Sequence, residues 1–416
     1  MNKFKLFLKK VFKVPMFIVF LFIIIFYGFP SLGRDAEVDE FAIVTAIGLD
    51  KGETENVDVS LLTFVPVAQQ NFAEKYKVVK ASGKSVLEAI DFAGLYLGRE
   101  VGLNHVKTVV INEEYFNENS SVEMDYLTRN KSLALSTSII CTDAKASEFL
   151  ETVQKMDTES SIKVDDIIAF NNKYIYSNES TFESFYKGLY SKTKSSLVSY
   201  LSLSEDNDEG VTVSASGEAS GGSGDTATKA SEETKKTLLN DGKAILCKNA
   251  QKVALLDNVD MQKLNLATGE FDSGTIVIEN FTDEIFHNAR LTFDIQNIKV
   301  KRKAQFKNDY PVINMSVDLY VKLLEAKEED NIDIKENIDL KNISKEAIIA
   351  LESKVKSSIA DAISLLRENK CDILKVYTLL NNSRPNETRK FMKTLADEQD
   401  FLNYVTFKVS PSIYSV

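Results

Sequence analysis

The 416-residue sequence predicts an α+β protein, in which an N-terminal transmembrane helix precedes a three-domain body of mixed α/β structure outside the cytoplasm. Three observations support this class. An uncharged apolar segment lies near the N-terminus, strand and helix patterns alternate up to residue 203, and a long alternating strand followed by helical patterns occurs after residue 289. Alternating strands and helices indicate a mixed sheet, whereas strands followed by helices are typical of α+β domains.

The apolar segment covers residues 14–33, and twenty helical residues at about 1.5 Å each would span the roughly 30 Å hydrocarbon core of a bilayer. Five lysines precede it, and no acidic residue occurs before Asp35. Since lysines are retained on the cytoplasmic side, residues 1–33 are predicted to form a basic cytoplasmic stub and a membrane anchor. The alternative is a cleaved signal peptide, whose apolar region would be shorter and whose cleavage site would be a better match than Ser31-Leu32-Gly33.

The charge of the chain argues against nucleic acid as a partner. The formal net charge is −11, and without the five N-terminal lysines the body has 45 basic and 61 acidic residues, or −16. Such a body has no electrostatic attraction to nucleic acid and would be repelled by an anionic membrane surface. The three cysteines, Cys141, Cys247 and Cys371, form no CxxC pair, so we interpret them as small buried thiols and not as a disulfide.

Residues 34–203 are predicted to form a first α/β domain with a mixed sheet. A buried strand at 41–48, a turn near Asp50–Gly52 and an alternating strand from Val57 predict a hairpin whose glycines need positive φ. Capping boxes at Ser85–Glu88 and Ser180–Glu183 each begin a helix, and the first helix ends at Gly98. Further strands are predicted at 76–82, 105–112, 133–142 and 195–203, and further helices at 121–129, 145–154 and 161–170.

The next two segments differ sharply in composition. Residues 204–236 are rich in Ser, Gly, Glu, Thr and Asp, which predicts a low-complexity flexible linker. Residues 237–288 are predicted to form a small second domain, with a hairpin and a helix at about 258–267 that ends at Gly269.

Residues 289–416 are predicted to form a third domain, an antiparallel sheet with C-terminal helices. The apolar parity of its first strand changes near Gln296-Asn297, which indicates a bulge. The next strand alternates over 313–323 and ends near Glu325, a bend residue or polar contact, and an amphipathic helix is predicted at 344–368. Two shorter helical segments and a closing strand at 403–409 follow.

No motif predicts catalysis, a metal site or a cofactor. His105 and His287 are the only histidines, and the chain contains no HExxH, GxSxG, EF-hand loop or P-loop. The sequence therefore favours a protein that is not an enzyme.

Two stretches of the sequence resemble conserved segments of the same protein family. "EVDEFAIVTAIGLDKG" is similar to the opening signature of the Ger(x)C family, the C subunits of bacterial spore germinant receptors. "GREVGLNHVKTVVINEEY" resembles the family's next conserved strand, and the later strand and helix continue the likeness in order. The positions that carry the resemblance are Glu37, Glu40, Gly48, Asp50, Gly52, Gly98, Arg99, His105, Lys107 and Glu325.

The resemblance implies a three-domain α+β fold, no enzymatic activity, and integral membrane A and B subunits as partners in a response to nutrients at the spore inner membrane. Family members usually have a lipidated Cys before the signature, but here no Cys precedes Cys141, so residues 14–33 would anchor the chain instead. After the long helix only "DILKVY", with Asp372 and Ile373, matches the family. The alternative is a membrane-anchored extracytoplasmic enzyme or an envelope sensor unrelated to germination.

Overall fold

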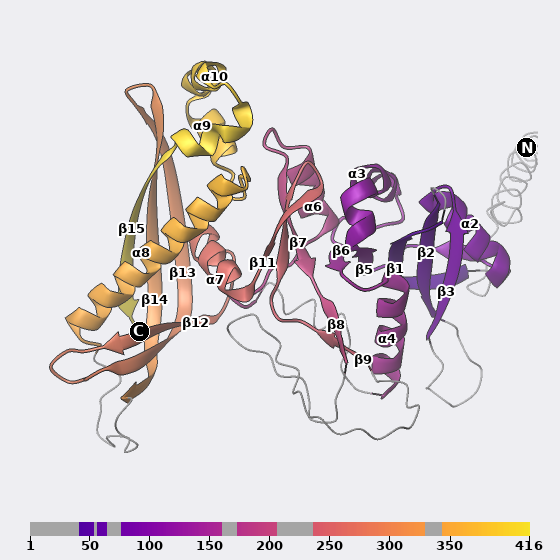
Figure 1. Cartoon of the computed structure of the whole chain (residues 1–416), viewed down its shortest axis with the longest axis horizontal. Coiled ribbons are helices and arrows are strands. Elements are labelled where there is room, and N and C mark those ends of the chain that lie inside the picture. Colours follow the sequence, from indigo (N-terminus) through magenta and orange to yellow (C-terminus); the bar gives the residue numbers. More distant parts are fainter. Residues whose placement is uncertain (1–40, 54–55, 65–75, 160–172, 206–235, 329–342) are drawn as a thin grey trace, which may run out of the picture. The chain divides into compact units, whose positions relative to one another are not determined.

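The computed structural model describes residues 41–53, 56–64, 76–159, 173–205, 236–328 and 343–416. Within these ranges the chain forms a nine-stranded sheet, a four-stranded sheet and a two-stranded ladder (Figure 1). The predicted anchor at 14–33 and the predicted helix at 161–170 lie outside the described residues. In the part of the chain that is described, no helix is long and apolar enough to cross a membrane.

The nine-stranded sheet has the order β11-β10-β7-β6-β5-β1-β2-β3, with β4 beside β1. The predicted hairpin is confirmed as the antiparallel pair of β1 and β2, whereas β1, β5, β6 and β7 run parallel. The strands are β1 (Phe41–Lys51), β2 (Val57–Phe64), β3 (Tyr76–Gly83), β4 (Glu100–Gly102), β5 (Thr108–Asn112), β6 (Ser138–Thr142), β7 (Ser195–Tyr200), β10 (Ala244–Lys248) and β11 (Gln251–Leu256).

Both faces of this sheet are covered by helices. On β5, Val109 belongs to one hydrophobic core and the adjacent Val110 to another on the opposite face. The first core contains residues of α2, α3 and α6, and the second contains residues of α4. The helices are α2 (Val86–Leu97), α3 (Glu113–Arg129), α4 (Ala146–Glu159) and α6 (Phe182–Leu189).

The helix ends confirm one predicted capping box and correct the other. The Ser85 side chain accepts a hydrogen bond from the Glu88 N–H, and Gly98 ends α2 with a φ of 63°. At α6 the cap is Thr181, which pairs with Ser184, and not Ser180 with Glu183. Ser180 is instead buried, and its hydroxyl donates to the Leu197 carbonyl, so it joins the start of α6 to β7.

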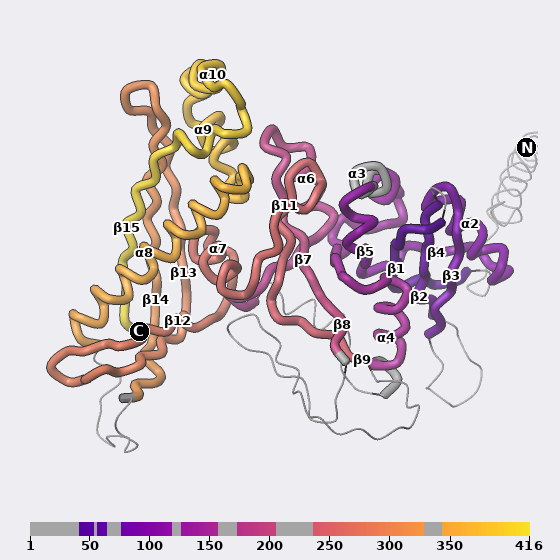
Figure 2. The backbone as a smooth tube through the Cα atoms, in the orientation of Figure 1, coloured from indigo at the N-terminus to yellow at the C-terminus, as the bar shows by residue number. Residues whose placement is uncertain are grey.

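Both ends of the predicted linker are strands. β8 (Ser202–Glu205) pairs antiparallel with β9 (Lys236–Leu239), so residues 204, 205 and 236 belong to a ladder (Figure 2). The remaining linker residues, 206–235, lie outside the described part of the chain.

The segment assigned to a small second domain is divided between the two large sheets. Its hairpin is confirmed as β10 and β11, but β10 also pairs antiparallel with β7 and so extends the first sheet. All five residues of β10 are buried, and pairing with β7 gives this strand the second neighbour that its backbone requires. The helix α7 (Asn258–Thr268) ends at Gly269 as predicted, and β12 (Gly274–Phe281) lies at the edge of the four-stranded sheet. The division of the chain into domains at residues 203, 236 and 288 stays a prediction.

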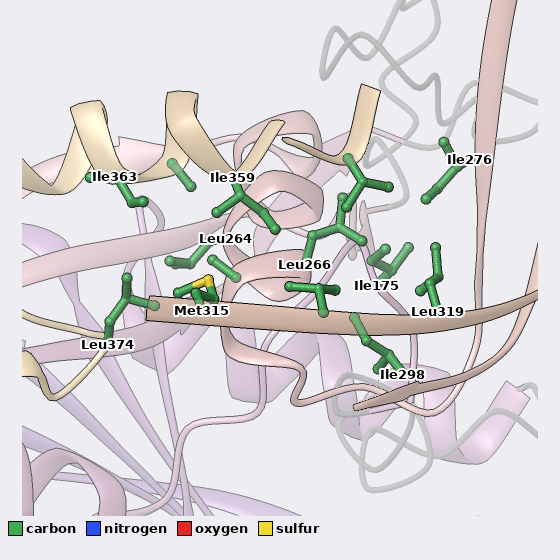
Figure 3. Packing of buried hydrophobic residues seen from close by; sticks show 14 of the residues in the cluster. Ile175, Leu264, Leu266, Ile276, Ile298, Met315, Leu319, Ile359, Ile363 and Leu374 are labelled. Atoms are coloured by element: carbon green, nitrogen blue, oxygen red, sulfur yellow. The ribbon is translucent and has the colours of Figure 1, made fainter. Parts of the chain in front are cut away.

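The four-stranded sheet has the order β12-β13-β14-β15, with β13 at Ala289–Lys307 and β14 at Tyr310–Glu328. The register between β13 and β14 shifts at Gln296, where the bulge was predicted. The face assignment of β14 is also confirmed, because every second residue from Ile313 to Leu323 is buried. Figure 3 shows Ile359 and Ile363 of α8 (Lys345–Glu368) packed over Met315 of β14 in the same core.

The closing strand β15 (Thr406–Ser415) pairs parallel with β14, so the prediction of a purely antiparallel sheet is wrong. A parallel neighbour needs a crossover and not a tight turn. Between the two strands lie α8, α9 (Val376–Ser383), α10 (Pro385–Thr394) and the 3₁₀ helix η3 (Glu398–Tyr404).

The three cysteines are buried and free, as predicted. Burial raises the pKa of the Cys371 thiol to about 11 and holds the pKa of Cys141 well above its usual range. Burial also raises the pKa of Cys247, so all three remain neutral thiols at ordinary pH and fill core space.

Candidate functional site

Residues of the signature stretch on β1 lie toward opposite ends of this strand and contact different parts of the fold. Gly48 and Asp50 lie near its carboxyl end, whereas Thr45 lies near its amino end beside His105 and Lys107. Glu37 and Glu40 lie outside the described residues.

At the carboxyl end, Asp50 caps helix α4 from a distant part of the chain. Its Oδ1 accepts a hydrogen bond from the Ala146 N–H at 2.6 Å, and its Oδ2 accepts one from the Ser147 N–H at 2.9 Å. Burial raises the pKa of Asp50 above the usual carboxyl value, although these two bonds oppose the shift. The carboxylate thus satisfies amides that a helix leaves without partners in its first turn.

Gly48 faces the same helix two residues earlier on β1. A Cβ at this position would lie 3.1 Å from the Cβ of Ala146 and 3.1 Å from the Cδ1 of Leu150. A Cβ at Gly52 would lie 2.9 Å from the Asn56 carbonyl oxygen. Neither glycine has a positive φ, so the predicted reason for them is wrong: close approach of other groups, and not an unusual turn, requires glycine here.

At the amino end of β1 an open pocket of about 580 Å³ is lined by the first residues of the parallel strands. We call it the β1 pocket. Two backbone hydrogen bonds join residues of its lining: the Lys107 N–H donates to the Thr45 carbonyl at 2.9 Å, and the Ser138 N–H donates to the Lys107 carbonyl at 2.8 Å. Its lining includes Thr45, Tyr76, His105, Lys107, Ser138 and Glu179.

Basic and aromatic side chains line the β1 pocket. His105 and Lys107 are exposed, and Tyr76 packs edge-on against Phe64 with ring centroids 5.7 Å apart. A lysine, a histidine and nearby hydroxyls can donate hydrogen bonds to an anionic group such as a carboxylate. Within the described ranges, no three His, Cys, Asp or Glu side chains are grouped closely enough to hold a metal ion.

The other signature positions are distributed over the fold. Gly98 ends α2, and the half-buried Arg99 donates its backbone N–H to the Gly94 carbonyl at 3.2 Å. Glu325 is exposed on β14 and pairs with Thr292, next to a shift of the register between Thr292 and Phe293. These residues therefore do not converge on the β1 pocket.

A buried polar joint between the two large sheets was missed by sequence reasoning. The Lys248 ammonium, on β10, donates to the carbonyls of Thr193 at 2.8 Å and Lys370 at 2.6 Å. Asp372, only 3% exposed, accepts hydrogen bonds from the N–H groups of Val376 at 2.7 Å and Tyr377 at 2.9 Å. Burial raises the pKa of Asp372 to about 6.

The same joint ties α9 to the first sheet through the backbone. The Asp372 N–H donates to the Ser195 hydroxyl of β7 at 3.0 Å, and the neighbouring Cys371 thiol lies 3.5 Å from the Cys247 carbonyl. The "DILKVY" stretch marked Asp372 as a retained position, but only the fold places it next to Lys248 and the first sheet.

Comparisons with known proteins give matches over most of the chain. Residues 34–203 match the family described as "Spore germination protein N-terminal domain", and residues 241–413 match "Spore germination B3/ GerAC like, C-terminal". No curated protein matches the chain. Among solved structures the chain is similar to one titled "Crystal Structure of the GerBC protein", with 16% identity, coverage of 89% of this chain and 96% of that chain, and a TM-score of 0.47.

Proposed function

Because the chain belongs to the GerAC, or Ger(x)C, family of spore germination proteins, we propose that it is the non-catalytic C subunit of a spore germinant receptor, needed for the response to nutrient germinants. One observation carries this proposal: the N- and C-terminal family matches follow each other in order, over residues 34–203 and 241–413. Likeness in both halves, in this order, supports a common role for the whole body.

The proposal that the subunit is non-catalytic is supported by the roles of its signature residues. Asp50 uses both carboxylate oxygens to cap α4, and Gly48 permits the same helix to approach β1. His105 lines a pocket at the other end of this strand. The signature therefore maintains a packing arrangement and a surface pocket, which is what an assembly subunit requires.

We further propose that the chain is held in the spore inner membrane by residues 14–33, with its N-terminus in the cytoplasm and its body outside. Only residues 34–40 separate the anchor from β1. Integral membrane A and B subunits would be its partners, and the β1 pocket is the surface where we expect a partner or a small ligand to make contact.

The functional proposal is tested by deleting the gene in a strain without a duplicate receptor. Spores should form and remain heat-resistant but respond slowly to at least one nutrient germinant, and a restored gene should return the normal rate. Normal germination with every nutrient would contradict the proposal and favour an envelope protein unrelated to germination.

The membrane proposal is tested by fractionation and by mass spectrometry of the mature N-terminus. The uncleaved chain should stay in the membrane fraction at high salt, because the attachment is hydrophobic. A mature protein that begins at Arg34 and is found free of membranes would establish a cleaved signal peptide instead.

A further inference from the structure

Helix α2 is apolar on two faces. Its inner face packs against the first core through Val86, Ala89, Ile90 and Ala93. On the outer face of its last two turns, Phe92 is 48% exposed, Leu95 76% and Tyr96 71%. These three residues, which we call the α2 patch, have the i, i+3, i+4 spacing that places side chains side by side on a helix.

The α2 patch lies at the end of the first sheet where β1 begins. The Lys77 ammonium is 5.4 Å from the centre of the Tyr96 ring, and Lys77 pairs with Thr63 across β3 and β2. The next residue of β2, Phe64, pairs with Ile43 of β1. Figure 2 shows α2 alongside β2 and β3 in this region.

The same end of the sheet receives the chain from the anchor that we propose at 14–33. The connection, residues 34–40, has seven residues and can reach about 25 Å at most when fully extended. A bilayer surface would therefore lie within a short tether of the strand end beside which the α2 patch is exposed.

We propose that the α2 patch rests on the lipid bilayer beside the anchor and fixes the orientation of the body on the membrane. This inference rests on the membrane anchor of the proposed function. Aromatic side chains with a polar tip, such as Tyr96, are favoured at the level of the lipid headgroups, and Phe92 and Leu95 would enter the acyl boundary. Electrostatic attraction to lipid headgroups would not drive this contact, because Asp91 is exposed on the same helix and the body is acidic as a whole. Burial of the apolar side chains would drive it instead.

The chain contains no tryptophan, so a single introduced indole reports its own surroundings. We would reconstitute the full-length Leu95→Trp variant in phosphatidylcholine vesicles, with and without bromine atoms near the top of the acyl chains. The expected result is emission at shorter wavelength than for an indole in water and a loss of fluorescence with the brominated lipid. Tyr96→Trp, also at an exposed position, should behave in the same way.

Two matched variants separate the possible outcomes. Ile349→Trp, on the outer face of α8 at 64% exposure, should show neither effect. Phe20→Trp, within the proposed anchor, should be quenched strongly.

If Phe20→Trp is not quenched, the anchor is wrong and the inference fails with it. Quenching at position 20 without quenching at 95 or 96 overturns this inference alone. A shift at position 95 without bromine quenching also overturns it, because a protein partner or a second copy would then cover the α2 patch. Equal quenching at positions 95 and 349 would likewise contradict a specific orientation.

Discussion

The two large sheets differ in how many of their faces are buried. In the first sheet, adjacent residues of β5 and β6 point into separate cores, and Val109, Val110, Ile139 and Ile140 are all fully buried. In the four-stranded sheet, β14 buries every second residue against α7 and α8, while its intervening residues are partly or fully exposed. A strand covered on both faces is mostly apolar at its centre, whereas a strand covered on one face alternates.

The comparison also explains where the signature residues lie. When both faces of a strand are buried, polar groups can reach helices or solvent chiefly at the strand ends. Asp50 and Lys107 lie at such ends, on β1 and next to β5. On the one-sided sheet, the polar Glu325 can lie within a strand at no cost because it faces water.

The largest effect should come from a charge on a buried face. We expect Val317→Asp to lower the free energy of unfolding by several kcal/mol, because the carboxylate would be buried without a partner. Ser316→Asp, one residue earlier and half-exposed opposite Lys301, should be tolerated. On β5, in contrast, Val109→Asp and Val110→Asp should both be severe. Chemical denaturation of the four variants checks this, and equal stabilities of the position 316 and 317 variants would disprove the assigned faces.

The next effect concerns the joint between the sheets and depends on pH. The pKa of Asp372 rises from 3.8 to about 6 on folding, so the folded state binds a proton at this carboxyl more tightly than the unfolded chain does. This tighter binding adds about 3 kcal/mol to the free energy of unfolding below about pH 4, and the contribution is lost as the pH rises through about 6. We expect the stability of the wild type relative to Asp372→Asn to fall between pH 4 and pH 7. A difference that does not change with pH would contradict the raised pKa.

A moderate effect should distinguish two signature carboxylates, one in each sheet. Asp50→Ala should cost about 1–2 kcal/mol because α4 loses its cap and a buried charged hydrogen-bond acceptor. Glu325→Ala, which removes an exposed side chain, should change stability by less than about 0.5 kcal/mol. Thermal melts of both variants test this contrast, and a larger loss for Glu325→Ala would favour its interpretation as a polar contact.

Gly48→Val should have a comparable effect through packing. Its Cβ would already lie within 3.1 Å of α4, and overpacking of this kind costs about 1–3 kcal/mol. The reduced stability should be accompanied by faster hydrogen exchange in α4 than in α8. Unchanged exchange in α4 would mean that the helix does not depend on the close approach at Gly48.

The smallest effect belongs to the wet face of the one-sided sheet. Lys322→Ala, at an exposed position of β14, should cost well under about 1 kcal/mol. Urea denaturation should give nearly the same midpoint as for the wild type. A loss as large as that of Val317→Asp would mean that another chain or segment covers this face.

The local elements could be predicted because their signals lie within a few consecutive residues. The alternation from Ile313 to Leu323, the bulge at Gln296 and the caps at Ser85 and Gly269 were all read from neighbouring side chains and were confirmed. The error at Ser180 was a shift of one residue, caused by two adjacent hydroxyl residues that can both cap a helix.

The sequence alone also identified which positions form the signature, but the structural reason predicted for its glycines was wrong. Gly48 was attributed to a turn, and its true neighbour, Ala146, is almost one hundred residues away in the chain. Asp50, His105 and Lys107 were named without a partner or a pocket, because capping of α4 and the lining of the β1 pocket require strands brought together by the parallel sheet.

The sequence by itself therefore determined the α+β class, the hairpins, several helix caps and the buried face of β14, since periodicity and capping depend on residues close together in the chain. It did not determine every helix limit, because α3 begins at Glu113 and not at residue 121. Only the tertiary structure decided that β10 extends the first sheet, that β15 runs parallel to β14, and that Asp372 is buried against the first sheet. Strand partners and buried charges arise from contacts between residues 45 to 177 positions apart, and no local pattern encodes which of several exposed edges a strand will join.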